Sequence, residues 1–133
     1  MKYILVVLLV CFCSTTSDKE TKNAINLIIN YEGDIDKPLP KIIFCKDCND
    51  KYDFRAYQFK MDENFFKSTN NFLLLNKYSK KRENTTVLSI IIDNNEKIYL
   101  QRKEAKLFIE KLIKLSHKDM LDNQLFKYLL KIN

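Results

Sequence analysis

Glycine, histidine, proline and tryptophan are scarce in this chain of 133 residues, which has 1 Gly, 1 His, 2 Pro and no Trp. A single glycine leaves little backbone that can approach a ligand closely, because every other residue carries a Cβ. The sequence contains no glycine-rich phosphate loop, no G-x-S-x-G elbow and no H-E-x-x-H zinc motif. We therefore expect no catalytic residue and no cofactor.

The composition is that of a globular protein. Hydrophobic residues make up 46% and charged residues 30% of the chain, which argues against disorder, and the length suits one domain. The formal net charge of +6 would suit acidic partners, but the 23 basic and 17 acidic residues are interspersed. Net charge alone therefore identifies no partner.

The N-terminus has the pattern of an export signal. One basic residue, Lys2, precedes an unbroken apolar run from Tyr3 to Cys13, and small polar residues follow. The run is too short to cross a bilayer, which takes ~20 helical residues, but it matches the core of a secretory signal. We expect residues 1–17 to be a signal peptide and residues 18–133 to form a single α+β domain.

Cys13 leaves two forms of export open. A cysteine followed by small polar residues resembles the anchor and tether of a bacterial surface lipoprotein, in which that cysteine is acylated. Such a signal has a small residue before the cysteine, whereas Phe12 precedes Cys13 and Val10 precedes Cys11. Cys13 is therefore a candidate lipid anchor, and simple secretion is the alternative.

Cys45 and Cys48 form a C-x-x-C motif in the stretch IIFCKDCNDKY. Redox catalysis would place this motif between a strand and a helix, with a cis-proline from downstream beside it. Here turn and strand residues follow the motif, and both prolines, Pro38 and Pro40, lie upstream. A redox-active pair remains an alternative, but the sequence does not favour it.

Two further chemistries are open to this pair. A zinc site needs about four ligands, and His117 is the only histidine that could join Cys45 and Cys48, so we expect no metal. In an exported protein the two thiols would oxidise to a disulfide across a hairpin turn. So short a ring should stabilise the fold by less than the typical ~2–4 kcal/mol. A reduced pair is the alternative.

A basic run, NKYSKKREN, concentrates Lys77, Lys80, Lys81 and Arg82. In a cytoplasmic protein this run would suggest nucleic acid. Export leaves no nucleic acid among the expected partners and favours anionic lipid headgroups or polyanionic glycans. A solvated loop without a partner is the alternative.

Hydrophobic periodicity predicts an antiparallel sheet of four or five strands. Alternation favours strands over residues 24–31, 41–45 and 52–61, and the last two should pair as a hairpin. Two β-rich runs around Asn94 and Asn95 predict a second hairpin.

This second hairpin covers about residues 86–101. A two-residue turn at Asn94 and Asn95 would place Ile91 opposite Ile98. Because both faces of the hairpin are apolar, we expect it to lie centrally in the sheet.

Two or three helices should pack on the sheet. Residues 63–78 have helical spacing after the N-cap Asp62, although residues 72–78 also fit a strand. Residues 103–115 carry one apolar stripe, and a capping box from Ser116 to Asp119 should begin a last helix.

The segment from FKMDENFFKSTNNFLLLN through VLSIIIDNNEKIYLQRKEAKLFIEKL resembles small uncharacterised exported or lipoprotein-like proteins of Bacteroidetes-type bacteria. These proteins share the order strand, helix, hairpin and amphipathic helix, with a YLxRKxA-like stretch that corresponds here to Tyr99, Leu100, Arg102, Lys103 and Ala105. The resemblance implies an envelope location and brings no activity or catalytic residue.

The sequence thus predicts an exported, non-enzymatic binding protein that is secreted or tethered to the cell envelope. We expect its partner to be another envelope or extracellular protein, or an anionic membrane surface. Two alternatives remain: an extracytoplasmic thiol-disulfide protein that uses Cys45 and Cys48, and a secreted effector or inhibitor that acts on another cell.

Overall fold

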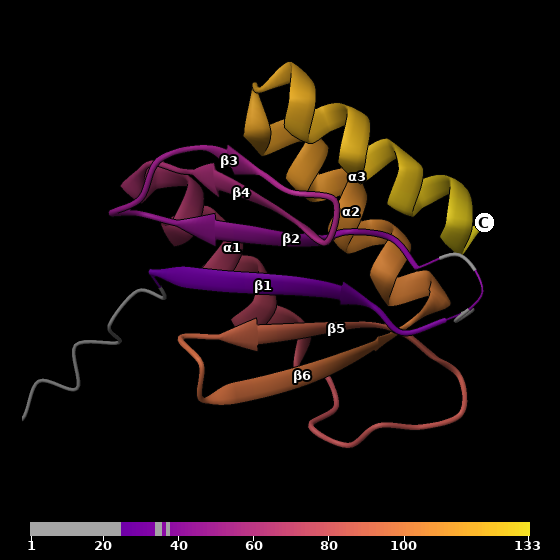
Figure 1. Ribbon diagram of the computed structural model, residues 1–133. Coiled ribbons are helices and arrows are strands. Elements are labelled where there is room, and N and C mark those ends of the chain that lie inside the picture. The colour runs from indigo at the N-terminus through magenta and orange to yellow at the C-terminus, as the bar shows by residue number, and fades with distance from the viewer. Residues whose placement is uncertain (1–24, 34–35, 37) are drawn as a thin grey trace, which may run out of the picture.

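One six-stranded sheet and three helices form the part of the chain that the computed structural model describes, residues 25–33, 36 and 38–133 (Figure 1). The expected signal peptide, residues 1–17, and the candidate lipid anchor Cys13 lie outside the described residues. The α+β class is confirmed. The elements follow the chain in the order β1 (Asn26–Tyr31), β2 (Lys41–Cys45), β3 (Lys51–Tyr52), β4 (Ala56–Lys60), α1 (Glu63–Asn76), β5 (Thr86–Ile92), β6 (Glu96–Gln101), α2 (Arg102–Ser116) and α3 (Asp119–Ile132).

The sheet is mixed rather than antiparallel. Its strand order is β3-β4-β2-β1-β5-β6, and β2 and β4 are parallel, whereas the other neighbours are antiparallel. The predicted hairpin between β2 and β4 is therefore wrong. The tight turn lies between β3 and β4, where Asp53 N–H donates to Ala56 O (2.9 Å) and Ala56 N–H donates to Asp53 O (3.2 Å). Strand β4 consequently enters the sheet between β3 and β2.

One face of the sheet forms the core together with the helices. Helices α1 and α2 lie behind the sheet in Figure 1, and α3 packs beside α2. Each fully buried large apolar side chain contributes roughly 1.5–3 kcal/mol of transfer free energy. The strand residues buried in this core are Leu27, Ile29, Ile42, Phe44, Phe59, Leu88, Ile90, Ile98 and Leu100.

The opposite face of the sheet, which we call the open face, carries the alternate residues of each strand. At its centre Ile28 of β1 pairs with Ile43 of β2 and with Ile91 of β5. All three isoleucines are half-buried, whereas their neighbours in the core are fully buried. The open face is thus apolar at its centre and partly accessible.

The hairpin of β5 and β6 covers the predicted residues, but it lies at the edge of the sheet, so the prediction of a central hairpin is wrong. The register also differs by one residue, because Ile90 pairs with Ile98 and Ile91 pairs with Lys97. Asp93 explains the shift. Its Oδ1 accepts hydrogen bonds from the N–H groups of Ile25 and Asn26, at 3.0 Å each, so Asp93 leaves the ladder and joins the turn with φ 49°.

The helices agree with the sequence in extent and differ at one cap. Asp62 caps α1 as predicted, and its carboxylate accepts a hydrogen bond from Phe65 N–H at 2.8 Å. Ser116 is not the N-cap of α3, because it is still the last residue of α2 and its hydroxyl donates to Asp122 instead. In the described part of the chain, no helix combines the length and apolar composition needed to cross a bilayer.

Candidate functional site

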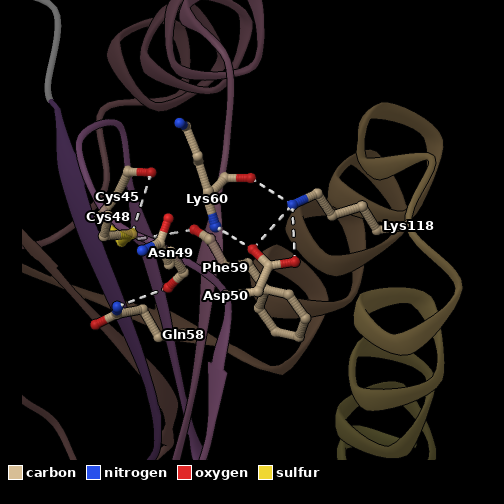
Figure 2. The surroundings of a disulfide bond; sticks show 8 residues. All are labelled: Cys45, Cys48, Asn49, Asp50, Gln58, Phe59, Lys60 and Lys118. Atoms are coloured by element: carbon tan, nitrogen blue, oxygen red, sulfur yellow. Dashed lines mark hydrogen bonds and ion pairs between the residues drawn. A yellow bond between two sulfur atoms is a disulfide. The ribbon is translucent and has the colours of Figure 1, made fainter.

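Cys45 and Cys48 are bonded to each other at the end of β2 (Figure 2). Their Cα atoms are 5.8 Å apart, within the usual range for a disulfide. Alternation along β2 places the Cys45 side chain on the open face. Cys45 pairs there with Asn26 of the neighbouring strand β1. We predicted that the motif occupies a hairpin turn. The structure differs, since the loop after the motif passes the end of β4 to reach β3.

The two sulfur atoms differ in exposure and contacts. Cys45 is buried and Cys48 is half-buried. The Cys45 Sγ lies 3.7 Å from the carbonyl oxygen of Phe59, and the Cys48 Sγ lies 3.6 Å from the carbonyl oxygen of Cys45. Both carbonyl oxygens would accept hydrogen bonds from reduced thiols. Each sulfur atom therefore has a carbonyl oxygen nearby that could accept a hydrogen bond from it after reduction.

Asp50 anchors the loop after the disulfide to two other elements (Figure 2). Its Oδ1 accepts from Lys60 N–H in β4 at 2.7 Å and from Lys118 Nζ at 3.1 Å. Burial acts to raise the pKa of Asp50, but the Lys60 N–H and the Lys118 ammonium outweigh it and hold this pKa below its ordinary value. The Lys118 Nζ also donates to Lys60 O, so one ammonium joins the loop, β4 and the start of α3.

The disulfide forms part of the wall of a cavity of about 400 Å³ on the open face, which we call the disulfide pocket. Isoleucine side chains supply its apolar part, and amides with one lysine and one aspartate supply its polar part. These groups could hold a small ligand or a partner's side chain by packing and hydrogen bonds. The pocket is lined by Ile25, Asn26, Ile28, Ile43, Cys45, Lys46, Asp47, Cys48, Gln58 and Asn94.

The basic run lies at the far edge of the sheet, beyond the end of α1. Lys80 pairs with Glu96 (2.9 Å) and Arg82 pairs with Glu32 (3.6 Å). Lys77 ends α1 in the left-handed conformation with φ 45°, and it lines a second cavity of about 490 Å³ together with Lys80. In the described part of the chain, Lys81 makes no ion pair. Lys77 and Lys80 thus share one cavity, Arg82 lines another, and acidic groups partly offset two of the four cations.

Tyr78 lies between these cations, and it also lines the second cavity. Burial, and then the carboxylate of Glu104, raise the pKa of Tyr78 to about 12. The phenol is therefore neutral at any physiological pH and can donate a hydrogen bond.

His117 has a structural position, as the left-handed C-cap of α2 with φ 50°. Among residues 25–33, 36 and 38–133, no three His, Cys, Asp or Glu side chains gather as a metal site would require. The sequence interpretation missed Leu74 and Leu75, which are 60% and 81% exposed. Their place directly before a basic run was the signal that could have found them.

Comparison with known proteins gives no relative, since no protein-family model, no curated protein and no solved structure matches this chain. The resemblance to exported proteins of Bacteroidetes-type bacteria stays a prediction.

Proposed function

We propose that this chain is an exported protein that works by binding rather than by catalysis, either secreted or tethered to the cell envelope. The disulfide between Cys45 and Cys48 carries the proposal, because such bonds persist in oxidising compartments and are rare where glutathione keeps thiols reduced. The apolar run from Tyr3 to Cys13 supports the same location.

The open face supports binding of another envelope or extracellular protein. Protein interfaces combine a buried apolar centre with a polar rim. Here Ile28, Ile43 and Ile91 form an apolar centre, and Asn26 and Gln58 lie towards the disulfide pocket. The half-buried isoleucines have area left to bury against a partner.

The mature N-terminus tests the export part of the proposal. Mass spectrometry of the protein from its own cells should find either an acylated Cys13 or a free N-terminus near Asp18. A soluble cytoplasmic protein that retains Met1 would contradict export. In that case nucleic acid would become a partner for the basic run again.

Site-specific cross-linking tests the binding part. A photoreactive amino acid in place of Ile43 should join the chain to an envelope or extracellular protein in living cells. The control replaces Leu107 of α2, which is 59% exposed on the helical side. Equal cross-linking from both positions, or none from Ile43, would contradict the proposed surface.

A thiol-disulfide function is the second candidate, because the disulfide borders an accessible pocket. A thiolate of a partner dithiol would attack the Cys48 sulfur, break the bond and leave the Cys45 sulfur as a thiolate that takes up a proton. The partner's second thiol would then release Cys48 and become oxidised itself. A Cys45→Ser/Cys48→Ser variant that folds but loses its cellular function would favour this candidate.

The effector or inhibitor alternative differs in where the mature chain accumulates. Release into the medium would support it, whereas retention in the membrane fraction would support an envelope protein.

A further inference from the structure

We propose that the last turn of α1 and the loop after it dock this protein on an anionic lipid bilayer. The surface, which we call the docking edge, consists of Leu74, Leu75, Lys77, Lys80, Lys81 and Arg82. This inference deepens the proposed function and rests on it, since it names a membrane as one partner of an exported protein.

Two exposed leucines supply the apolar part of the docking edge. The buried side of α1 is formed by Phe65, Phe66, Thr69 and Leu73, so the next two residues point away from the core. Leu74 is 60% and Leu75 is 81% exposed. Single exposed apolar residues are normal on soluble proteins. Adjacent leucines at the end of a helix, beside a run of cations, match the composition of segments that lie in a membrane interface.

Lys80 and Arg82, the two paired cations of the docking edge, are more exposed to solvent than their acidic partners. The Lys80 side chain is 75% exposed and that of Glu96 is 49% exposed, while Arg82 is 62% and Glu32 only 16% exposed. Ion pairs at this exposure are weak, so lipid phosphates can compete for the cations. Lysine side chains can also keep their ammonium in the headgroup layer while their methylenes contact acyl chains.

One cavity brings a leucine and two cations of the docking edge together. Leu74, Lys77 and Lys80 line the same cavity, whose other residues include Leu73 and Ile98. The loop is fixed to the sheet edge because Tyr99 N–H donates to Ser79 O at 2.9 Å. Figure 1 shows this loop beyond β6, away from α3, where a flat surface could approach it. The fixed loop means that docking requires little ordering of the chain.

The cations have a second explanation, since charged residues beside an edge strand also prevent strand pairing between molecules. That role requires no exposed leucines and no affinity for lipid. Vesicle binding by matched variants therefore separates the two explanations.

The experiment measures binding of the purified protein to phosphatidylglycerol vesicles and to phosphatidylcholine vesicles by co-sedimentation. We expect binding to phosphatidylglycerol that exceeds binding to phosphatidylcholine and weakens with salt. Lys77→Gln/Lys81→Gln should reduce the affinity roughly 25-fold, since each cation near an anionic surface contributes roughly a fivefold gain. The two substitutions leave the ion pairs of Lys80 with Glu96 and of Arg82 with Glu32 intact. The control is Lys106→Gln/Lys114→Gln on α2, which changes the net charge equally.

The apolar part has its own pair of variants. Leu74→Ser/Leu75→Ser should reduce vesicle affinity by roughly tenfold or more and leave binding to heparin, a soluble polyanion, unchanged. Its control is Phe126→Ser/Leu130→Ser on α3, where the side chains are 54% and 60% exposed. Circular dichroism checks that each variant is folded.

Three outcomes would overturn the inference: no preference for phosphatidylglycerol, equal losses in the docking-edge and control variants, or full binding by the leucine variant. Binding to heparin without binding to vesicles would point to a glycan instead. A mature, exported chain that fails to bind vesicles would remove this inference alone. A cytoplasmic chain with Met1 would remove the proposed function, whatever the vesicles show.

Discussion

The hydroxyl of Tyr128 in α3 donates a hydrogen bond to the main-chain carbonyl oxygen of Pro40, 88 residues earlier in the chain. The Tyr128 ring is fully buried and meets the Tyr31 ring edge-on, with the centroids 6.4 Å apart. The last helix, the segment before β2 and the end of β1 are therefore fixed to one another by one side chain.

Tyr128→Phe should lower the free energy of unfolding by about 1–2 kcal/mol, because the Pro40 carbonyl loses a partner while the ring packing remains. Urea denaturation measures this loss. The control Tyr57→Phe, on a half-buried ring of β4, should change stability by no more than about 0.5 kcal/mol. Equal losses in the two variants would show that the hydrogen bond to Pro40 contributes nothing specific.

Stability should fall above about pH 10. Burial raises the pKa of Tyr128 above the ordinary value of 10.0, and burial together with Glu104 raises the pKa of Tyr78 to about 12. Above pH 10 these phenols ionise in the unfolded chain but stay protonated in the folded one, so ionisation stabilises the unfolded state. Their contribution is fully present below pH 10 and decreases as the pH rises towards the folded pKa values.

The pH dependence of Tyr128→Phe checks the assignment. The loss should approach about 1.4 kcal/mol per pH unit for each such tyrosine, so the variant should show a shallower decrease than the wild type. All other side chains are the same in the two proteins, so their effects cancel in the comparison. Parallel curves from pH 9 to pH 11 would contradict a raised Tyr128 pKa.

Removal of the disulfide should have a small effect on stability. Loop-closure entropy for so short a ring amounts to about 2 kcal/mol, and the reduced thiols find acceptors in the carbonyl oxygens of Phe59 and Cys45. Cys45→Ser/Cys48→Ser should therefore remain folded, with a loss of at most about 2 kcal/mol by urea denaturation. Wild-type protein treated with a dithiol reductant should behave alike. A loss of more than about 4 kcal/mol would mean that the bond holds the end of β2 in place.

Local patterns predicted the helices and most strands of this fold well. Asp62 could be recognised as a cap because its carboxylate bonds the N–H of a residue three positions on, and β2 coincides with the run KIIFC. The hairpin register could not be predicted in this way. Asp93 lies outside the ladder, where its carboxylate accepts hydrogen bonds from the N–H groups of Ile25 and Asn26 at the start of β1; the contact with Ile25 spans 68 residues.

The prediction that β2 and β4 form an antiparallel hairpin was wrong for a related reason, since the two strands pair in parallel. Two neighbouring β-rich runs favour a hairpin, and nothing local shows that the short strand β3 intervenes and that the chain then returns beside β2. The candidate site likewise combines a feature that is local in the sequence with a contact between distant residues. The C-x-x-C motif is visible in the sequence, whereas the ion pair of Asp50 with Lys118, which braces the loop after the motif, joins residues 68 positions apart.

This brace should couple the loop to α3 without adding much stability. The side chains of Lys118 and Asp50 are 34% and 37% exposed, so solvent screens the pair, and Asp50→Asn should cost only about 0.5 kcal/mol near pH 7. Because the folded pKa of Asp50 is lowered, its contribution is present above the ordinary value of 3.8 and is lost as the pH falls below it. Wild type and variant should therefore converge in acid, and Asp47→Asn in the same loop is the control.

The larger effect of Asp50→Asn should be kinetic. With the ammonium of Lys118 no longer paired, the loop moves more freely, and a reductant should reach the half-buried Cys48 sulfur sooner. Timed alkylation of the thiols during treatment with a dithiol measures the rate. We expect faster reduction in Asp50→Asn than in the wild type or in Asp47→Asn. Equal rates in all three would mean that the sheet end alone, and not the contact with α3, limits access to the disulfide.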